Sequence, residues 1–254
     1  MKKSILYDKI VERKGDFMFF IDWTYIVLVL PAILIAMIAS ARVSSVFNTY
    51  AKDMSAWGIS AAEVTRRLLD ANGLSHIAVE KVRGHLTDHY DPRANVIRLS
   101  EATYSSASCA AIGVAAHEVG HALQYKESYL PIKIRAAIIP ATNIGSKLAL
   151  PLILIGILFS AFSVYFSYIA YIGVACFALT LIFQLVTLPT EFNASKRALR
   201  ALEKNNILFE DELPKAKKVL NAAAMTYVAA LAVTVAQILR FLIIIASASG
   251  RRRD

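Results

Sequence analysis

The chain has 254 residues, of which 57% are hydrophobic and 19% are charged, and its formal net charge is +9. A soluble domain has about 45–50% apolar and about 25% charged residues. The composition excludes a disordered chain, a collagen-like repeat and a small disulfide-stapled domain. Cys109 and Cys176 lie in apolar segments without metal-type spacing, so they indicate no redox compartment. The basic charge suits either a nucleic acid or a membrane surface.

The first apolar segment, residues 23–40, contains no charged residue. It predicts a membrane-spanning helix over 18–40, because a span needs about 20 apolar residues and a buried core helix is shorter. The long apolar run and the weak cleavage site after it favour a signal anchor over a cleaved signal peptide.

Two longer apolar segments follow. Residues 148–190 contain no Asp, Glu, Lys, Arg or His, and residues 219–249 are interrupted only by Arg240. With a break near 160–167, these segments predict further spans at 148–163, 167–188 and 225–247. Arg240 is expected to face the helix bundle, because a charge exposed to lipid is costly. We therefore expect a mainly α, multi-pass cell-membrane protein with about four transmembrane helices, whose partner is the lipid bilayer and not a nucleic acid.

Two polar regions separate the spans, and four spans place both of them on the same side of the membrane. In the first region, Ser60 and Glu63 form a capping box that opens a helix ending near Gly73. Short strands are expected at 77–82 and 95–99, with a turn-rich connection between them. The predicted organisation begins with a first span at 18–40 and a catalytic domain at 41–147, which contains a helix at 105–125. A membrane hairpin at 148–188 follows, then two amphipathic helices at 189–224 divided around Asn205, and a last span at 225–247.

The basic residues give opposing signals for orientation. Lys and Arg before the first span and at 251–253 favour cytoplasmic termini by the positive-inside rule, whereas the 189–224 region carries seven Lys and Arg residues of its own. The balance slightly favours cytoplasmic termini.

Residues 117–121 read His-Glu-Val-Gly-His, within the expected helix 105–125. Positions i and i+4 share one helical face, so His117 and His121 can bind one zinc ion while Glu118 acts as the base for a metal-bound water. Gly120 costs up to about 1 kcal/mol relative to Ala inside a helix. We therefore expect another backbone, or a substrate, to approach the helix closely at this residue.

A catalytic zinc needs a third protein ligand and an open position. No histidine follows His121, which excludes a third histidine at the close spacing of the longer H-E-x-x-H-x-x-G-x-x-H motif. His76 is better explained as a residue at a strand end. Glu191 is the first charged residue after the apolar hairpin and follows Pro189-Thr190, so it is either the third ligand or a carboxylate that stabilises the start of a helix.

The segments HEVGHALQ, LTDHYDPR and TLPTEFNASKRAL together resemble the YugP-like neutral zinc metallopeptidases, a type-2 family of small membrane proteins. The resemblance runs nearly end to end. It implies a relation to HtpX-type membrane gluzincins, whose third zinc ligand is the Glu of an EFxAD motif. By this resemblance His117, His121 and Glu191 hold Zn²⁺, and Glu118 is the catalytic base and acid.

The chain departs from the wider group at Ser195, where that group has Asp. An Asp there can orient a ligating histidine, and a serine can accept the same hydrogen bond without bringing a charge. Asn193 is a second candidate for this task.

Two secondary sites are candidates near the metal. Residues 95–99 precede the catalytic helix and are either an ordinary strand of a hairpin or an edge strand that binds a peptide in extended form. His89 or Tyr90 is a candidate donor to the oxyanion. His85 and His89 are not expected to form a second metal site, because their segment is turn-rich.

The sequence thus predicts a membrane-bound zinc metalloendopeptidase that hydrolyses membrane-associated or misfolded proteins. A site-2-type intramembrane protease is one alternative, but it would need an Asp ligand in a later span, and the last two predicted spans contain none. The other alternative is a non-catalytic, zinc-stabilised scaffold or chaperone-like partner, which would not need the carboxylate of Glu118.

Overall fold

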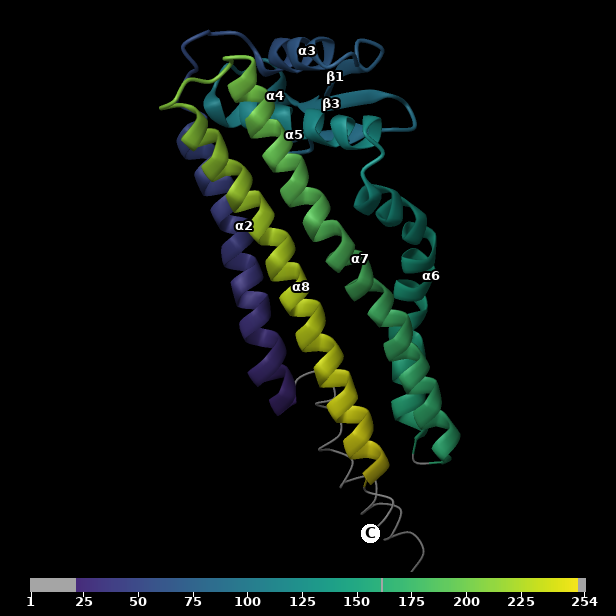
Figure 1. Cartoon of the computed structure of the whole chain (residues 1–254). Coiled ribbons are helices and arrows are strands. Elements are labelled where there is room, and N and C mark those ends of the chain that lie inside the picture. Colours follow the sequence, from purple (N-terminus) through teal and green to yellow (C-terminus); the bar gives the residue numbers. More distant parts are fainter. Residues whose placement is uncertain (1–21, 161, 251–254) are drawn as a thin grey trace, which may run out of the picture.

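The computed structural model describes residues 22–160 and 162–250. The first helical segment is a π-helical turn, η2 (Tyr25–Val29), that continues into the α-helix α2 (Leu30–Tyr50). The other long helices are α6 (Leu130–Phe159), α7 (Val164–Lys204) and α8 (Leu213–Gly250). Four helical segments are long and apolar enough to cross a membrane, which confirms the mainly α, four-span prediction. Figure 1 shows α2 packed along α8 and α6 packed along α7.

The helices differ in extent from the predicted segments. The two helices expected at 189–224 are the continuations of α7 and α8, and α6 begins at Leu130, well before the predicted span 148–163. Charged residues at the end of a membrane helix keep its helical hydrogen bonds and place their side chains in water, so the change in composition does not end the helix. Residues 18–21 of the first predicted span, and the Lys and Arg of both termini, lie outside the described residues.

The polar ends of these helices carry a small domain (Figure 1). Its remaining elements are α3 (Ala61–Ala71), β1 (Ala78–Val82), β2 (His89–Asp91), β3 (Val96–Ser100), α4 (Glu101–Tyr104) and α5 (Cys109–Lys126). The backbone N–H of Glu63 donates to the Ser60 hydroxyl at 3.2 Å, as the capping box predicts, and Gly73 has φ +66° after the helix ends. The expected strands at 77–82 and 95–99 are confirmed.

The sheet corrects the expected edge strand. Its order is β1-β3-β2, with β1 parallel and β2 antiparallel to β3, so residues 95–99 form the central strand. The edge strand is β2, which lies inside the segment expected to be only a turn-rich connection. β2 has just three residues, so it offers too little alternation to be recognised in the sequence.

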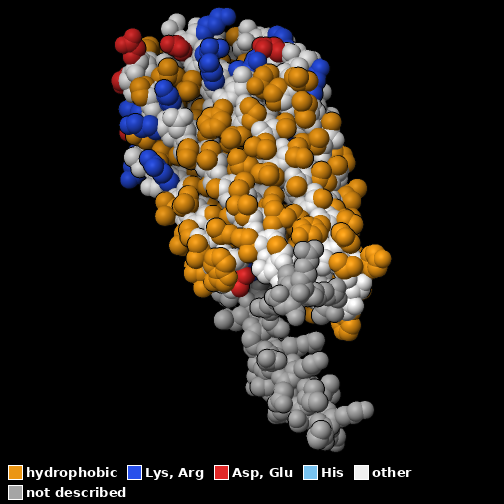
Figure 2. Space-filling model, turned by 60° about the horizontal axis from the view of Figure 1, so that its bottom comes forward, with side chains coloured by type: hydrophobic (Ala, Val, Ile, Leu, Met, Phe, Trp, Pro, Cys, Tyr) orange, Lys and Arg blue, Asp and Glu red, His pale blue; other side chains and the backbone are white. Residues whose placement is uncertain are grey.

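Helix α5 lies at the centre of the domain core, between α3, α7, the sheet and the start of α8. Thirteen of its residues are buried, and its small side chains allow neighbouring helices to approach on several sides. The long helices, in contrast, expose many large hydrophobic side chains. Figure 2 shows these covering the flanks of the helices, while most charged side chains gather towards the domain end. This distribution is that of a multi-pass membrane protein with its polar domain at one surface.

Arg240 faces the helix bundle, as predicted for a charge inside a span. Its side chain is 5% exposed, and its Nε donates to Oδ1 of Asp22 at 3.1 Å. Its guanidinium also lies 5.4 Å from the ring centroid of Tyr25. The ion pair therefore joins α8 to the start of the first helical segment.

Candidate metal centre

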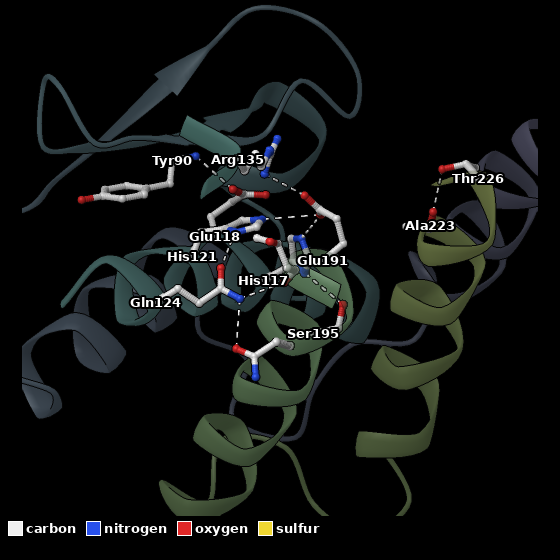
Figure 3. A network of polar contacts seen from close by, with 12 residues as sticks. Tyr90, His117, Glu118, His121, Gln124, Arg135, Glu191, Ser195, Ala223 and Thr226 are labelled. Atoms are coloured by element: carbon white, nitrogen blue, oxygen red, sulfur yellow. Dashed lines mark hydrogen bonds and ion pairs between the residues drawn. The ribbon is translucent and has the colours of Figure 1, made fainter. Parts of the chain in front are cut away.

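Helix α5 presents both histidines of the motif on one face. Ser108 caps its first turn by accepting from the N–H of Ala111 at 3.2 Å, which fixes where the helix starts. The rings of His117 and His121 then lie one turn apart, with centroids separated by 4.7 Å (Figure 3). The predicted i and i+4 arrangement is therefore present.

Glu191 of α7 faces these two rings. Its Oε2 lies 3.3 Å from Nε2 of His117 and 3.6 Å from Nε2 of His121. Its Oε1 accepts from Arg135 of α6 at 3.1 Å. One carboxylate oxygen is therefore directed at the two ligand nitrogens, while the other is held by a guanidinium.

The position of Glu191 within its helix differs from the expectation. Pro189 and Glu191 lie inside the continuous helix α7, so Glu191 does not open a helix. Membrane helices tolerate an internal proline, and α7 continues through Pro189 without a break. Because Glu191 is buried far from the start of its helix, helix-start stabilisation no longer accounts for its charge.

Both histidines have an acceptor for their second ring nitrogen. Nδ1 of His117 lies 3.1 Å from the Ser195 hydroxyl, and Nδ1 of His121 lies 3.0 Å from Oε1 of Gln124. Gln124 in turn donates to the Thr190 carbonyl and to Asn193 Oδ1 at 2.8 and 3.0 Å. When each Nδ1 donates in this way, each Nε2 lone pair is free to face a metal. Ser195 and Asn193 thus occupy the supporting positions that the sequence suggested, Asn193 acting through Gln124.

Glu118 also lies at the site, but it is not part of the group formed by His117, His121 and Glu191. Its Oε2 accepts from the backbone N–H of Tyr90, in edge strand β2, at 2.9 Å. The side chain of His89 is exposed and lies beside Arg98, and the Tyr90 ring packs against Tyr125. Neither of these side-chain contacts involves His117, His121 or Glu191. Tyr90 is therefore linked to the site by its backbone N–H.

The other histidines stand apart from this group. His76 is exposed just before β1, and the ring of His85 packs edge-on against Phe47, with centroids 5.5 Å apart. Among the residues that the structure describes, His117, His121 and Glu191 form the group with metal-type spacing, their ligand atoms lying within 4.8 Å of one another.

The geometry of this group fits zinc. In a tetrahedral site with ligand bonds of about 2.0–2.1 Å, neighbouring ligand atoms are about 3.3–3.4 Å apart, close to the separations of Glu191 from the two histidines. Burial lowers the pKa of His121, but the hydrogen bond to Glu191 and the charges of Glu118 and Glu191 outweigh it and raise that pKa above its usual value. The site therefore favours a positive charge at this point, which a divalent cation can supply.

Three site residues had no predicted role. Gln124 is fully buried, the Arg135 guanidinium donates to Glu191, and Tyr227 of α8 lines the same cavity as Glu191. Gln124 gave a weak signal, since it follows His121 by three residues on the same helix. Arg135 and Tyr227 gave none, because their proximity to Glu191 depends on how α6 and α8 pack.

The fold and this site together define a multi-pass membrane protein with a group of side chains that could hold a metal ion. A match to the family described as "Putative neutral zinc metallopeptidase" covers residues 25–246, and the chain belongs to that family. It is also 43% identical over 220 residues to the "Putative membrane protease YugP" of Bacillus subtilis (strain 168), an alignment covering 87% of this chain and 96% of the relative. No solved structure matches the chain.

Proposed function

We propose that the chain is a membrane-bound, zinc-dependent metalloendopeptidase with His117, His121 and Glu191 as the metal ligands. The observation that carries this proposal is the convergence of α5 and α7, which places two Nε2 atoms and one carboxylate oxygen at ligand separations. Family membership supports zinc as the metal. A carboxylate base beside the group, Glu118, supports catalysis rather than a purely structural site.

Zinc, when bound, supplies the Lewis acid that polarises a peptide carbonyl and makes a water more acidic. Glu118 takes the proton of the attacking water and returns it to the nitrogen of the leaving amine. The Tyr90 N–H holds one oxygen of Glu118, so the other oxygen is left for this proton transfer. Ser195 and Gln124 fix the planes of the ligand rings during the reaction.

Edge strand β2 is the proposed binding site for the substrate backbone. It pairs with β3 on one side, and the N–H of Tyr90 on its other side faces Glu118. A peptide added along this edge in extended form would pass the base and the metal ligands. Because Glu191 lies on a membrane helix near its polar end, the proposed substrates are membrane-associated or misfolded proteins whose unfolded segments lie near the bilayer.

A removal and reconstitution experiment tests this function. Protein purified in detergent is treated with a chelator, dialysed and returned to one equivalent of Zn²⁺, while casein cleavage is followed throughout. We expect cleavage to disappear with the metal and to return with Zn²⁺. Cleavage that is unaffected by complete metal removal would contradict the proposal, as would a protein that binds zinc stoichiometrically and cleaves neither casein nor a membrane-protein fragment.

A further inference from the structure

A cavity of about 200 Å³ adjoins the metal-ligand group. One wall is the site itself, with His117, Glu118 and Glu191. The opposite wall comes from the membrane helices, with Val43 of α2 and Ala223 of α8. A substrate residue beside the bond being cleaved would therefore lie within reach of this space.

The walls away from the metal ligands are mainly apolar. They include Val114, Leu220 and Ala224 as well as Val43 and Ala223. Two small residues of α8, Ala223 and Ala224, leave room where larger side chains would fill the space. Figure 3 shows Ala223 on the helix that stands across from Glu191.

The carboxylate of Asp88, which also lines the cavity, is already hydrogen-bonded. The carboxylate of Asp88 accepts from the Ser100 N–H at 2.8 Å, the Ser100 hydroxyl at 2.9 Å and the Thr103 hydroxyl at 3.2 Å. A polar or charged side chain that enters the cavity would lose its hydrogen bonds to water and could replace them only by breaking one of these bonds. An apolar side chain has no hydrogen bonds to lose.

The volume sets the size of the occupant. An apolar protein cavity of about 150 Å³ holds a benzene ring, so about 200 Å³ accepts a Leu, Met or Phe side chain. Alanine would leave most of the space empty and would forgo the contacts that the walls offer.

We propose that this cavity is the specificity subsite for an apolar side chain next to the scissile bond of the substrate. The inference rests on the proposed peptidase function and names the substrate feature that its site selects. Because α2 and α8 are membrane helices, the subsite joins the metal centre to the part of the molecule that faces the bilayer. Segments rich in Leu, Met or Phe are the ones exposed when a membrane protein misfolds, and they fit this subsite.

Binding of peptide hydroxamates tests the subsite without relying on turnover. The hydroxamate binds zinc, and a series that differs only in one side chain (Ala, Leu, Phe, Asp) reports on the cavity. For zinc-loaded wild-type protein we expect Kd to be at least about tenfold lower for Leu and Phe than for Ala, and Asp to bind worst. Peptide substrates with the same substitutions should show the same order in kcat/KM.

Ala223→Leu fills the cavity from α8, and Val43→Phe fills it independently from α2. Both variants should retain wild-type zinc content and Ala-hydroxamate affinity, and should lose the preference for Leu and Phe. Ala232→Leu is the matched control, because it lies nine residues further along α8, about two and a half turns at about 3.6 residues per turn, at an exposed position. It should behave as wild type. If one filling variant fails to fold, the other still tests the cavity.

Equal Kd values across the series, or a preference unchanged in both folded filling variants, would overturn the subsite even if the protein cleaves casein. Affinity that rises equally for every hydroxamate in the filled variants would also overturn it, since the cavity would then hold detergent or lipid. A protein that binds zinc and prefers Leu and Phe hydroxamates but cleaves no peptide would contradict the peptidase function and leave the apolar cavity supported.

Discussion

Gly120 of α5 lies directly against the backbone of Ala194 in α7. A Cβ atom on Gly120 would collide with the Ala194 carbonyl oxygen and would stand 3.0 Å from its carbonyl carbon. Ala194 is three residues after Glu191, so this contact sets the distance between the helix that carries both histidines and the helix that carries the proposed third ligand. The close backbone approach expected from a glycine inside the motif is confirmed.

Gly120→Ala should push α5 and α7 apart and separate the ligands. Overpacking of this kind costs about 1–3 kcal/mol, so a lower melting temperature and a lower zinc content are expected. Gly113→Ala is the matched control within α5, since its Cβ would stand 3.0 Å from Cβ, 3.3 Å from Cα and 3.6 Å from the carbonyl oxygen of Ala216, without the collision that a Cβ on Gly120 would meet. Zinc content by elemental analysis should fall clearly more for Gly120→Ala. Equal zinc content in the two variants would contradict the role given to this contact.

Glu191→Gln should abolish stoichiometric zinc binding. The amide is a far weaker zinc ligand than the carboxylate, and the substitution also leaves the Arg135 guanidinium without its charged partner. Glu203→Gln, at an exposed position near the end of the same helix, should bind zinc as wild type does. Wild-type zinc affinity of Glu191→Gln, measured by competition with a chromogenic chelator, would refute Glu191 as the third ligand.

Substitutions of Ser195 should change zinc affinity in opposite directions. Ser195→Ala removes the acceptor for Nδ1 of His117, and the loss of such a partner costs about 10–100-fold in metal affinity. Ser195→Asp introduces a charged acceptor at the same position, which should make the imidazole a stronger donor and tighten zinc binding. Chelator competition on both variants provides the measurement, and a weaker affinity for Ser195→Asp than for Ser195→Ala would contradict this account.

Tyr90→Pro should lower cleavage without changing zinc content. Proline removes the N–H that holds Glu118, and the antiparallel ladder to β3 does not use that N–H. Loss of this alignment should reduce kcat by about tenfold or more. Tyr90→Phe keeps the N–H and removes only the phenol, so its kcat should remain near that of wild type. A larger loss in Tyr90→Phe than in Tyr90→Pro would show that the side chain, and not the backbone, matters here.

Much of this arrangement could be predicted from the sequence because the signals are local. Long charge-free segments predicted the spans, the capping box at Ser60 predicted α3, and the spacing of His117 and His121 predicted a shared helical face. Glu191 could be proposed as a ligand, but its place inside a continuous α7 could not, because Pro189 suggests a break that helix packing overrides.

The remaining features depend on contacts between distant segments. Strand β2 forms through three residues that pair with β3, and the apolar cavity forms where Val43 and Ala223 meet α5 and α7. Arg135 reaches Glu191 only because α6 packs along α7. No local sequence pattern encodes these contacts between distant segments. The sequence therefore predicts the edge strand at the wrong residues, 95–99, and does not predict the cavity.

Glu118→Gln, compared with wild type purified in the same detergent, tests the proposed peptidase function most directly through its zinc content and casein cleavage. The substitution leaves His117, His121 and Glu191 in place and removes the base. We expect one zinc per chain in both proteins and cleavage reduced by at least about a hundredfold in the variant. Equal cleavage by the two proteins, at equal zinc content, would contradict the proposed function.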